Sequence, residues 1–291
     1  MVKWYAEMVK LTHMNIFSII LSNIAFLLAT TILAVGVLLL YNKMPLAWFM
    51  ENGTNKDAVD HRLQYHPSPR IKNTLEKVLF CFGLVLLSFV FFLQYGYSLM
   101  LICNVIPLFF LAMILVSDLK TGIIPDQFVF GLIFSSLFWI TADIAILLSE
   151  GQPIYIAATD RILAALCGGA ILFFIGKIGS FILKQDAMGM GDVKLIFACG
   201  LIVNFAGIFW IIILSFMIAL IPSILGIINK KSRHQERVDP PSNELNPLSK
   251  AESGVFASNQ LPFAPFIVTA VLMYLIFPVE FTWLASWYGG L

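Results

Sequence analysis

Charged residues are scarce in this sequence. Only 12% of its 291 residues are Asp, Glu, Lys or Arg, whereas 59% are hydrophobic. Soluble domains carry about 25% charged residues, so this scarcity argues against a soluble domain. Several apolar runs exceed the roughly 18 residues that cross a hydrocarbon core. We therefore predict an all-α fold, a polytopic transmembrane helix bundle with about eight transmembrane segments.

Cysteines are few, and clusters of basic residues with interleaved aromatics are missing. Cys81, Cys103, Cys167 and Cys199 each lie inside an apolar run, and no two form a CxxC pair. We interpret them as small buried hydrophobes, which excludes a disulfide framework or a zinc knuckle. The lack of a basic patch excludes nucleic acid as a partner. No small-residue cleavage site follows the apolar stretch 16–41, so we expect a retained span there.

The apolar runs predict eight helices along the chain. Segment 194–204 is too short to cross a bilayer upright, so it is either a half-span or continues into the next segment. Polar stretches 42–76 and 230–261 interrupt the runs, and the second, which has no apolar periodicity, predicts a flexible linker. The predicted helices cover 16–41, 77–93, 98–116, 127–148, 160–183, 194–204, 206–229 and 262–288.

The distribution of Lys and Arg predicts the orientation in the membrane. If the N-terminus is outside and all eight segments cross, fourteen of these residues fall in inside loops and three outside. This bias matches the positive-inside rule, under which basic loops stay in the cytoplasm. The stretches "SDLKTGIIPD" (117–126) and "MGMGDVK" (188–194) are then both expected on the cytoplasmic side.

Each of these loops carries an aspartate at the end of an apolar run. Asp192 opens the sixth predicted helix, where N-capping offers a structural explanation. Asp118 ends the third, where the helix dipole disfavours a carboxylate, so capping does not explain it. Two carboxylates in one cavity can share a proton, and such a pair can activate water and assist the peptide group. Gly189 and Gly191 lack a Cβ, which gives an extended peptide room beside Asp192.

The chain also resembles a family of membrane enzymes. Its stretches "SDLKTGIIPDQF" (117–128), "GMGDVKL" (189–195) and "LPFAPF" (261–266) are similar to motifs of the type IV prepilin peptidases, GxGD-class membrane aspartyl proteases. The resemblance covers roughly residues 98–288 and implies that Asp118 and Asp192 are the catalytic pair. It implies site-shaping roles for Pro125, Asp126, Gly189, Gly191 and Lys194. Pro262, Phe263 and Pro265 match the last motif, with no role that the sequence alone provides.

By this resemblance we expect a prepilin peptidase, an aspartic endopeptidase that needs no cofactor for proteolysis. It would remove the basic leader from type IV prepilins, or from pseudopilins of type II secretion, by cutting after a glycine. The expected partners are these substrates and the lipid bilayer. The expected location is the bacterial inner membrane, as a multi-pass protein whose active site faces the cytoplasm. The oligomeric state stays open.

The N-terminal part departs from the family pattern. We expect residues 1–97 to form an N-terminal membrane region with the cytoplasmic loop 42–76, and 98–291 to form the peptidase domain. Many bacterial members carry two zinc-binding CxxC pairs in this loop and also methylate the new N-terminus with S-adenosylmethionine. Here the loop has no cysteine, and His61 and His66 are its only soft metal ligands. We expect no metal there, because zinc wants four ligands. A bifunctional peptidase and N-methyltransferase using S-adenosylmethionine remains an alternative.

Further alternatives concern the chemistry of the acidic residues. Asp126 and Asp186 compete for the catalytic role, but Asp126 can N-cap the fourth predicted helix and Asp186 lies outside the GxGD spacing. A proton-coupled transporter also uses intramembrane acids, although mid-span charges are few and no internal repeat is visible. Intramembrane peptidases of the presenilin and signal-peptide-peptidase type share GxGD. Those enzymes carry "YD" in the partner motif, where this chain has "SD" at 117–118.

Overall fold

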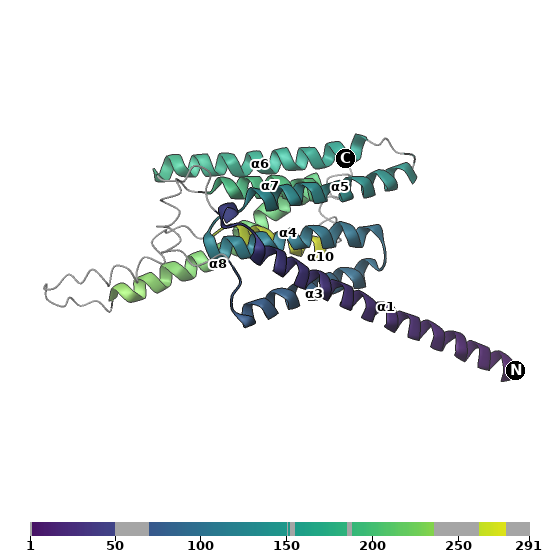
Figure 1. The fold of residues 1–291 in the computed structure, drawn as a ribbon. Helices are drawn as coiled ribbons and strands as arrows, with labels where there is room; N and C mark the ends of the chain where they lie inside the picture. Colours follow the sequence, from purple (N-terminus) through teal and green to yellow (C-terminus); the bar gives the residue numbers. More distant parts are fainter. Residues whose placement is uncertain are drawn as a thin grey trace. The chain divides into compact units, whose positions relative to one another are not determined.

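The computed structural model describes residues 2–49, 70–149, 151, 155–184, 188–235 and 262–277, and every regular element in these ranges is helical (Figure 1). This confirms the prediction of an all-α fold. The elements are α1 (Val2–Lys43), the 3-10 turn η1 (Leu46–Phe49), α3 (Thr74–Tyr95), α4 (Leu99–Thr121), α5 (Asp126–Ser149), α6 (Tyr155–Leu183), α7 (Met190–Ile202), α8 (Phe205–Gln235) and α10 (Ala264–Ile276).

Six of the described helices are long and apolar enough to cross a membrane, so the chain is a multi-pass helical bundle. Their apolar parts are Leu21–Lys43, Thr74–Tyr95, Leu99–Thr121, Asp126–Ala145, Ala158–Ile182 and Phe205–Ile224. The predicted eight segments therefore correspond to these six helices together with two shorter ones, α7 and α10. Each of the two has 13 residues. At 1.5 Å per residue such a helix extends about 20 Å, less than the roughly 30 Å of a hydrocarbon core.

Several predicted boundaries differ from the structure. The first predicted helix, 16–41, begins earlier, because α1 is helical from Val2. Segment 194–204 does not continue into the next helix: α7 begins at Met190, and Val203 and Asn204 separate it from α8. The last predicted helix, 262–288, ends early, at Ile276, and residues 278–288 lie outside the described part. The predicted linker 230–261 is helical up to Gln235, because Lys, Arg and Gln are good helix formers that extend α8; residues 236–261 are not described.

The chain divides into two compact units, and the first comprises residues 1–44 and 70–109. It contains α1, α3 and the first half of α4. Phe26 stacks on Phe92 with ring centroids 4.3 Å apart, and the Tyr97 hydroxyl donates to the Ser22 carbonyl at 2.8 Å. The first contact joins α1 to α3, and the second joins α1 to the connection between α3 and α4. The functional division into 1–97 and 98–291 stays a prediction.

The second unit, residues 45–69 and 110–291, is organised around α7. This short helix contacts α5, α6, α8 and α10, and α5, α6 and α7 run alongside one another in Figure 1. Close approach to α6 depends on a missing side chain, because a Cβ on Gly200 would lie 2.4 Å from the Ala165 Cα atom. Small residues at helix crossings permit this kind of packing in membranes, where van der Waals contact drives association.

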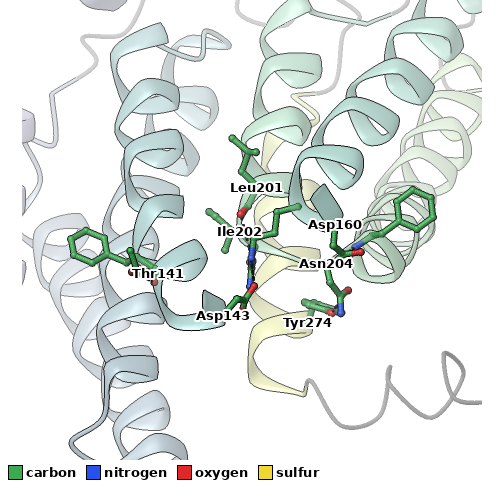
Figure 2. Close-up of polar contacts among 10 residues, drawn as sticks. Thr141, Asp143, Asp160, Leu201, Ile202, Asn204 and Tyr274 are labelled. Atoms are coloured by element: carbon green, nitrogen blue, oxygen red, sulfur yellow. Dashed lines mark hydrogen bonds and ion pairs between the residues drawn. The ribbon is translucent and has the colours of Figure 1, made fainter. Parts of the chain in front are cut away.

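A buried arginine holds the C-terminal end of α7. Arg161 of α6 donates from Nε to Asp143 Oδ2 at 2.6 Å and from Nη1 to the carbonyl oxygens of Leu201 and Ile202. Its guanidinium also lies 4.9 Å from the Trp139 ring centroid. Figure 2 shows Asp143, Leu201 and Ile202 converging at this point. The positive charge thus satisfies carbonyl groups that a helix end leaves without partners.

The break between α7 and α8 is fixed by side-chain oxygens (Figure 2). Asn204 Oδ1 accepts from the Gly207 N–H at 2.7 Å and from the Tyr274 hydroxyl of α10 at 2.9 Å. Asp160 Oδ2 accepts from the Phe205 N–H at 3.2 Å. The first bond is an N-cap, which starts α8 only two residues after α7 ends. The far end of α7 therefore has a fixed position relative to α6, α8 and α10.

The contact at Gly200 generates a stability prediction. We expect Gly200→Ala to lower the free energy of unfolding by about 1–3 kcal/mol, because the new methyl meets the α6 backbone. Gly169→Ala is the matched control, since its Cβ would lie an ordinary 3.5 Å from Phe197 Cβ. Its effect should stay within about 0.5 kcal/mol. Detergent denaturation of the reconstituted protein measures both, and equal losses in the two variants would contradict the packing described.

Candidate active site

Asp118 lies in the last turn of α4, as the sequence pattern predicts for the end of an apolar run. Only 5% of it is exposed. The helix ends just after it, where Gly122 takes a positive φ of 65° and donates its N–H to the Asp118 carbonyl at 2.8 Å. The Ser117 hydroxyl donates to the Ile123 carbonyl at 2.8 Å, which folds the following loop back over the helix end. The glycine cap supplies the left-handed residue such an ending requires.

Asp192 lies in the first turn of α7 and is 7% exposed. The expectation that it caps the helix is wrong, because Gly189 occupies the N-cap position with φ −71° and ψ 141°. Asp192 is the third residue of the helix, and its N–H donates to the Gly189 carbonyl at 3.2 Å. The carboxylate is still at the end of α7 where the helix dipole favours negative charge. The position of this side chain is therefore set by the GMGD turn.

The two carboxyl groups line one pocket of about 670 Å³. Burial, and then the negative charge of Asp118, raise the pKa of Asp192 to about 7. The second cause shows that the two groups act on each other electrostatically. A carboxyl group with such a pKa holds its proton close to neutral pH, which an ordinary aspartate does not. The pocket thus combines two acidic groups in the way that acid–base hydrolysis needs.

Asp126 is engaged elsewhere in the pocket wall. Its Oδ1 accepts from Lys194 Nζ at 2.7 Å, with 36% of the Asp126 side chain and 50% of the Lys194 side chain exposed. The expectation that Asp126 is the N-cap of α5 is wrong, since it is the first helical residue. Pro125 precedes it, and the Pro125 carbonyl accepts from the N–H groups of Phe128 and Val129. Asp126 differs from Asp118 and Asp192 in that its carboxylate forms an ion pair. This ion pair links α5 to α7.

The two glycines of GMGD have different surroundings. A Cβ on Gly189 would lie 3.6 Å from Asp192 Oδ2, so a side chain there would cover the carboxyl group. A Cβ on Gly191 would lie 3.2 Å from the Ile124 side chain, which is tighter than ordinary contact. The space beside Gly191 is therefore filled by Ile124 of the IIPD loop. Gly191 lets the two motifs pack together, whereas Gly189 leaves room next to the carboxylate.

Several residues in the pocket wall were not expected from the sequence. Trp48 of η1 lines the pocket. Its neighbour Phe49 packs edge-on against Phe128 of α5, with 6.2 Å between the ring centroids. Lys177 of α6 also lines it. A charge inside an apolar span is a recognised sign of function, so Lys177 carried a usable signal. Nothing in the sequence around Trp48 pointed to this pocket.

The remaining sequence candidates lie either outside the described residues or away from the residues that line this pocket. Asp186, His61 and His66 lie outside the described residues. All four cysteines are free, with Cys103 and Cys199 buried and the other two partly exposed. Within the described ranges, no group of three His, Cys, Asp or Glu side chains could hold a metal ion. Pro262, Phe263 and Pro265 mark the start of α10.

Comparison with known proteins yields one match. Residues 105–224 match the sequence profile of the type IV leader peptidase family. Searches of curated proteins and of solved structures found no significant match. The matched segment runs from α4 into α8 and includes both buried aspartates. The part of the chain that carries Asp118 and Asp192 is therefore similar to the type IV leader peptidase family.

Proposed function

We propose that this protein is a membrane aspartyl endopeptidase that removes the basic leader from type IV prepilins or pseudopilins. It would cut after a glycine at the cytoplasmic face of the bacterial inner membrane. One observation carries the aspartic mechanism: Asp118 and Asp192 come from separate motifs of a leader peptidase segment and meet, both buried, in one pocket.

In the proposed mechanism the ionised Asp118 removes a proton from a water molecule, whose oxygen attacks the carbonyl carbon of the scissile peptide. The protonated Asp192 donates a hydrogen bond to the carbonyl oxygen and stabilises the negative charge that develops there. The tetrahedral intermediate then collapses, the C–N bond breaks, and a proton from the pair passes to the leaving amine. The products are a new carboxylate and a new amino terminus, and the pair returns to one shared proton.

An apolar groove beside the pocket offers a path for the substrate. An apolar groove of about 640 Å³ lies along α5, α6 and α7, and it shares Asp126, Phe173, Val193 and Lys194 with the catalytic pocket. Its walls include Gly169 and Ala170 of α6, where a second helix can approach closely. We propose that the hydrophobic helix of the substrate lies in this groove while its leader stays in water. The scissile bond then falls where the groove joins the pocket.

The catalytic pair is tested by removing each acid separately. We expect Asp118→Asn and Asp192→Asn each to lower the cleavage rate of a prepilin by at least about a hundredfold, because each loses one proton-transfer group. Asp160→Asn, at the far end of the unit, is the control and should keep the wild-type rate. The assay uses protein in lipid nanodiscs and mass spectrometry of the product. Cleavage at the wild-type rate by either pocket variant would refute the aspartic mechanism.

The pKa of Asp192 leads to a pH prediction. As the acid, Asp192 must be protonated, so its contribution to the rate is present below its pKa of about 7 and is lost as the pH rises through that value. We expect kcat/KM to fall above pH 7 by about tenfold per unit. The substrate should carry no histidine and a blocked amino terminus, so that it does not titrate in this range. A rate that stays constant from about pH 6 to 9 contradicts the role given to Asp192.

The groove is tested by filling it. We expect Ala170→Trp to raise KM for a prepilin by roughly tenfold with little change in kcat, which corresponds to about 1.4 kcal/mol of lost binding. Leu163→Trp is the matched control, because Leu163 is also exposed on α6 but does not line the groove. Equal effects of the two substitutions would place the substrate helix elsewhere.

A further inference from the structure

One face of α6 borders the catalytic pocket and carries a lysine. Phe173, Gly176, Lys177 and Ser180 all line the pocket, and their spacing of three and four residues places them on one side of the helix. Lys177 lies within the apolar span Ala158–Ile182, and it is exposed. A charge inside such a span is costly, and it tends to face a cavity in which it has a function.

The ammonium group of Lys177 turns toward the middle of α6. Its Nζ atom lies 5.8 Å from the centroid of the Phe173 ring, one helical turn earlier in the chain. A lysine near the end of a span ordinarily extends toward the nearer water interface. The nearer end of α6 is Leu183, which lies on the other side of Lys177 from Phe173. Escape of the charge to the membrane surface therefore does not explain its position.

Lys177 forms no ion pair with any residue that the structure describes. The other lysine that lines the pocket, Lys194, is already paired with Asp126 at 2.7 Å. In the described part of the pocket wall, Lys177 is thus the positive charge that remains available to a bound molecule. A negatively charged group is the ligand that such an ammonium group binds best.

Two glycine contacts fix the alignment of α6 with α7 and the turn before it. A Cβ on either glycine would lie in contact with a side chain, at 3.5 Å for Gly169 with Phe197 and at 3.4 Å for Gly176 with Met188. The two segments therefore run antiparallel, and Asp192 lies level with the part of α6 that contains Phe173. Lys177 follows Phe173 by one turn, about 6 Å of rise. The ammonium group is accordingly within one turn of the level of the catalytic pair.

Peptide hydrolysis creates a new negative charge in this pocket. When the C–N bond breaks, the scissile carbonyl carbon keeps the oxygen of the attacking water and becomes a carboxylate on the leader, and the released amine takes up a proton. Asp118 and Asp192, which then share one proton, carry one negative charge between them. Like charges this close repel each other, so the leader carboxylate is stable in the pocket only beside a cation.

We propose that the Lys177 ammonium group is the binding site for the carboxylate that proteolysis creates at the end of the leader. This assignment rests on the proposed peptidase function and deepens it by naming a product site. Lys177 lines the pocket but not the apolar groove that we assign to the substrate helix, so it lies on the leader side of the scissile bond. The uncut substrate has a neutral peptide group there and gains little from the charge.

The test compares two peptides that differ only at the C-terminus. Both carry a fluorescent label and the leader sequence up to the glycine at the cut, but one ends in a carboxylate and the other in an amide. Fluorescence anisotropy measures the Kd of each for the full-length protein in lipid nanodiscs. For the wild-type protein we expect a Kd about tenfold lower for the carboxylate peptide. Lys177→Gln should remove this preference, whereas Lys177→Arg, which keeps the charge, should retain it.

Lys184→Gln is the matched control, because Lys184 follows the last residue of α6 and does not line the pocket. It should keep the wild-type preference. We also expect Lys177→Gln to leave KM for uncut prepilin within about twofold of the wild-type value. Equal Kd values for the two peptides in the wild-type protein, or a preference that survives in Lys177→Gln, would overturn the product site. Binding is measured without turnover, so a wild-type protein that cleaves no prepilin would refute the peptidase by a separate result.

Discussion

The burial of Asp192 at the start of α7 is the constraint on which the rest of the second unit depends. A carboxyl group in apolar surroundings is costly, and it persists only where the neighbouring structure leaves it no alternative position. Here α7 contacts four other helices, and Arg161 binds the carbonyl groups at its C-terminal end. The absence of a side chain at Gly200 lets α7 pack closely against α6. The stability of these contacts compensates for the desolvation of the acid. The same burial raises the pKa of Asp192 to about 7, as the proton-donor role that we propose for it requires.

Each helix end around the pocket supplies a different residue of its wall. The C-terminal turn of α4 presents Asp118, the first turn of α7 presents Asp192, and α5 begins with the residue that binds Lys194. The ion pair of Asp126 and Lys194 joins the IIPD and GMGD motifs, and Ile124 fills the space that Gly191 leaves open. The two motifs are therefore one packed structure, although 68 residues separate the members of the ion pair.

The sequence predicted the helical class, most helix positions and the meeting of Asp118 with Asp192. Those features depend on the length of apolar runs and on the placement of charged residues, and both can be read from the sequence without knowing any tertiary contact. Capping was mispredicted at Asp126 and Asp192, because the identity of a cap depends on which residue leaves helical geometry. The place of Trp48 in the pocket wall could not be predicted, since it depends on how the chain folds back after α1. The start of α8 after only two residues required Asn204, whose capping role is clear only once Tyr274 and Gly207 are placed around it.

A shared proton is the central claim, and infrared spectroscopy tests it most directly. The protein is labelled with ¹³C at the aspartate carboxyl groups, reconstituted in lipid without substrate, and titrated while the carbonyl stretch of protonated carboxyl groups is followed. The account predicts a band at pH 6 that is lost as the pH rises through about 7 and that is missing in the Asp192→Asn variant. A band that persists unchanged in that variant, or no titrating band near neutral pH, would contradict it.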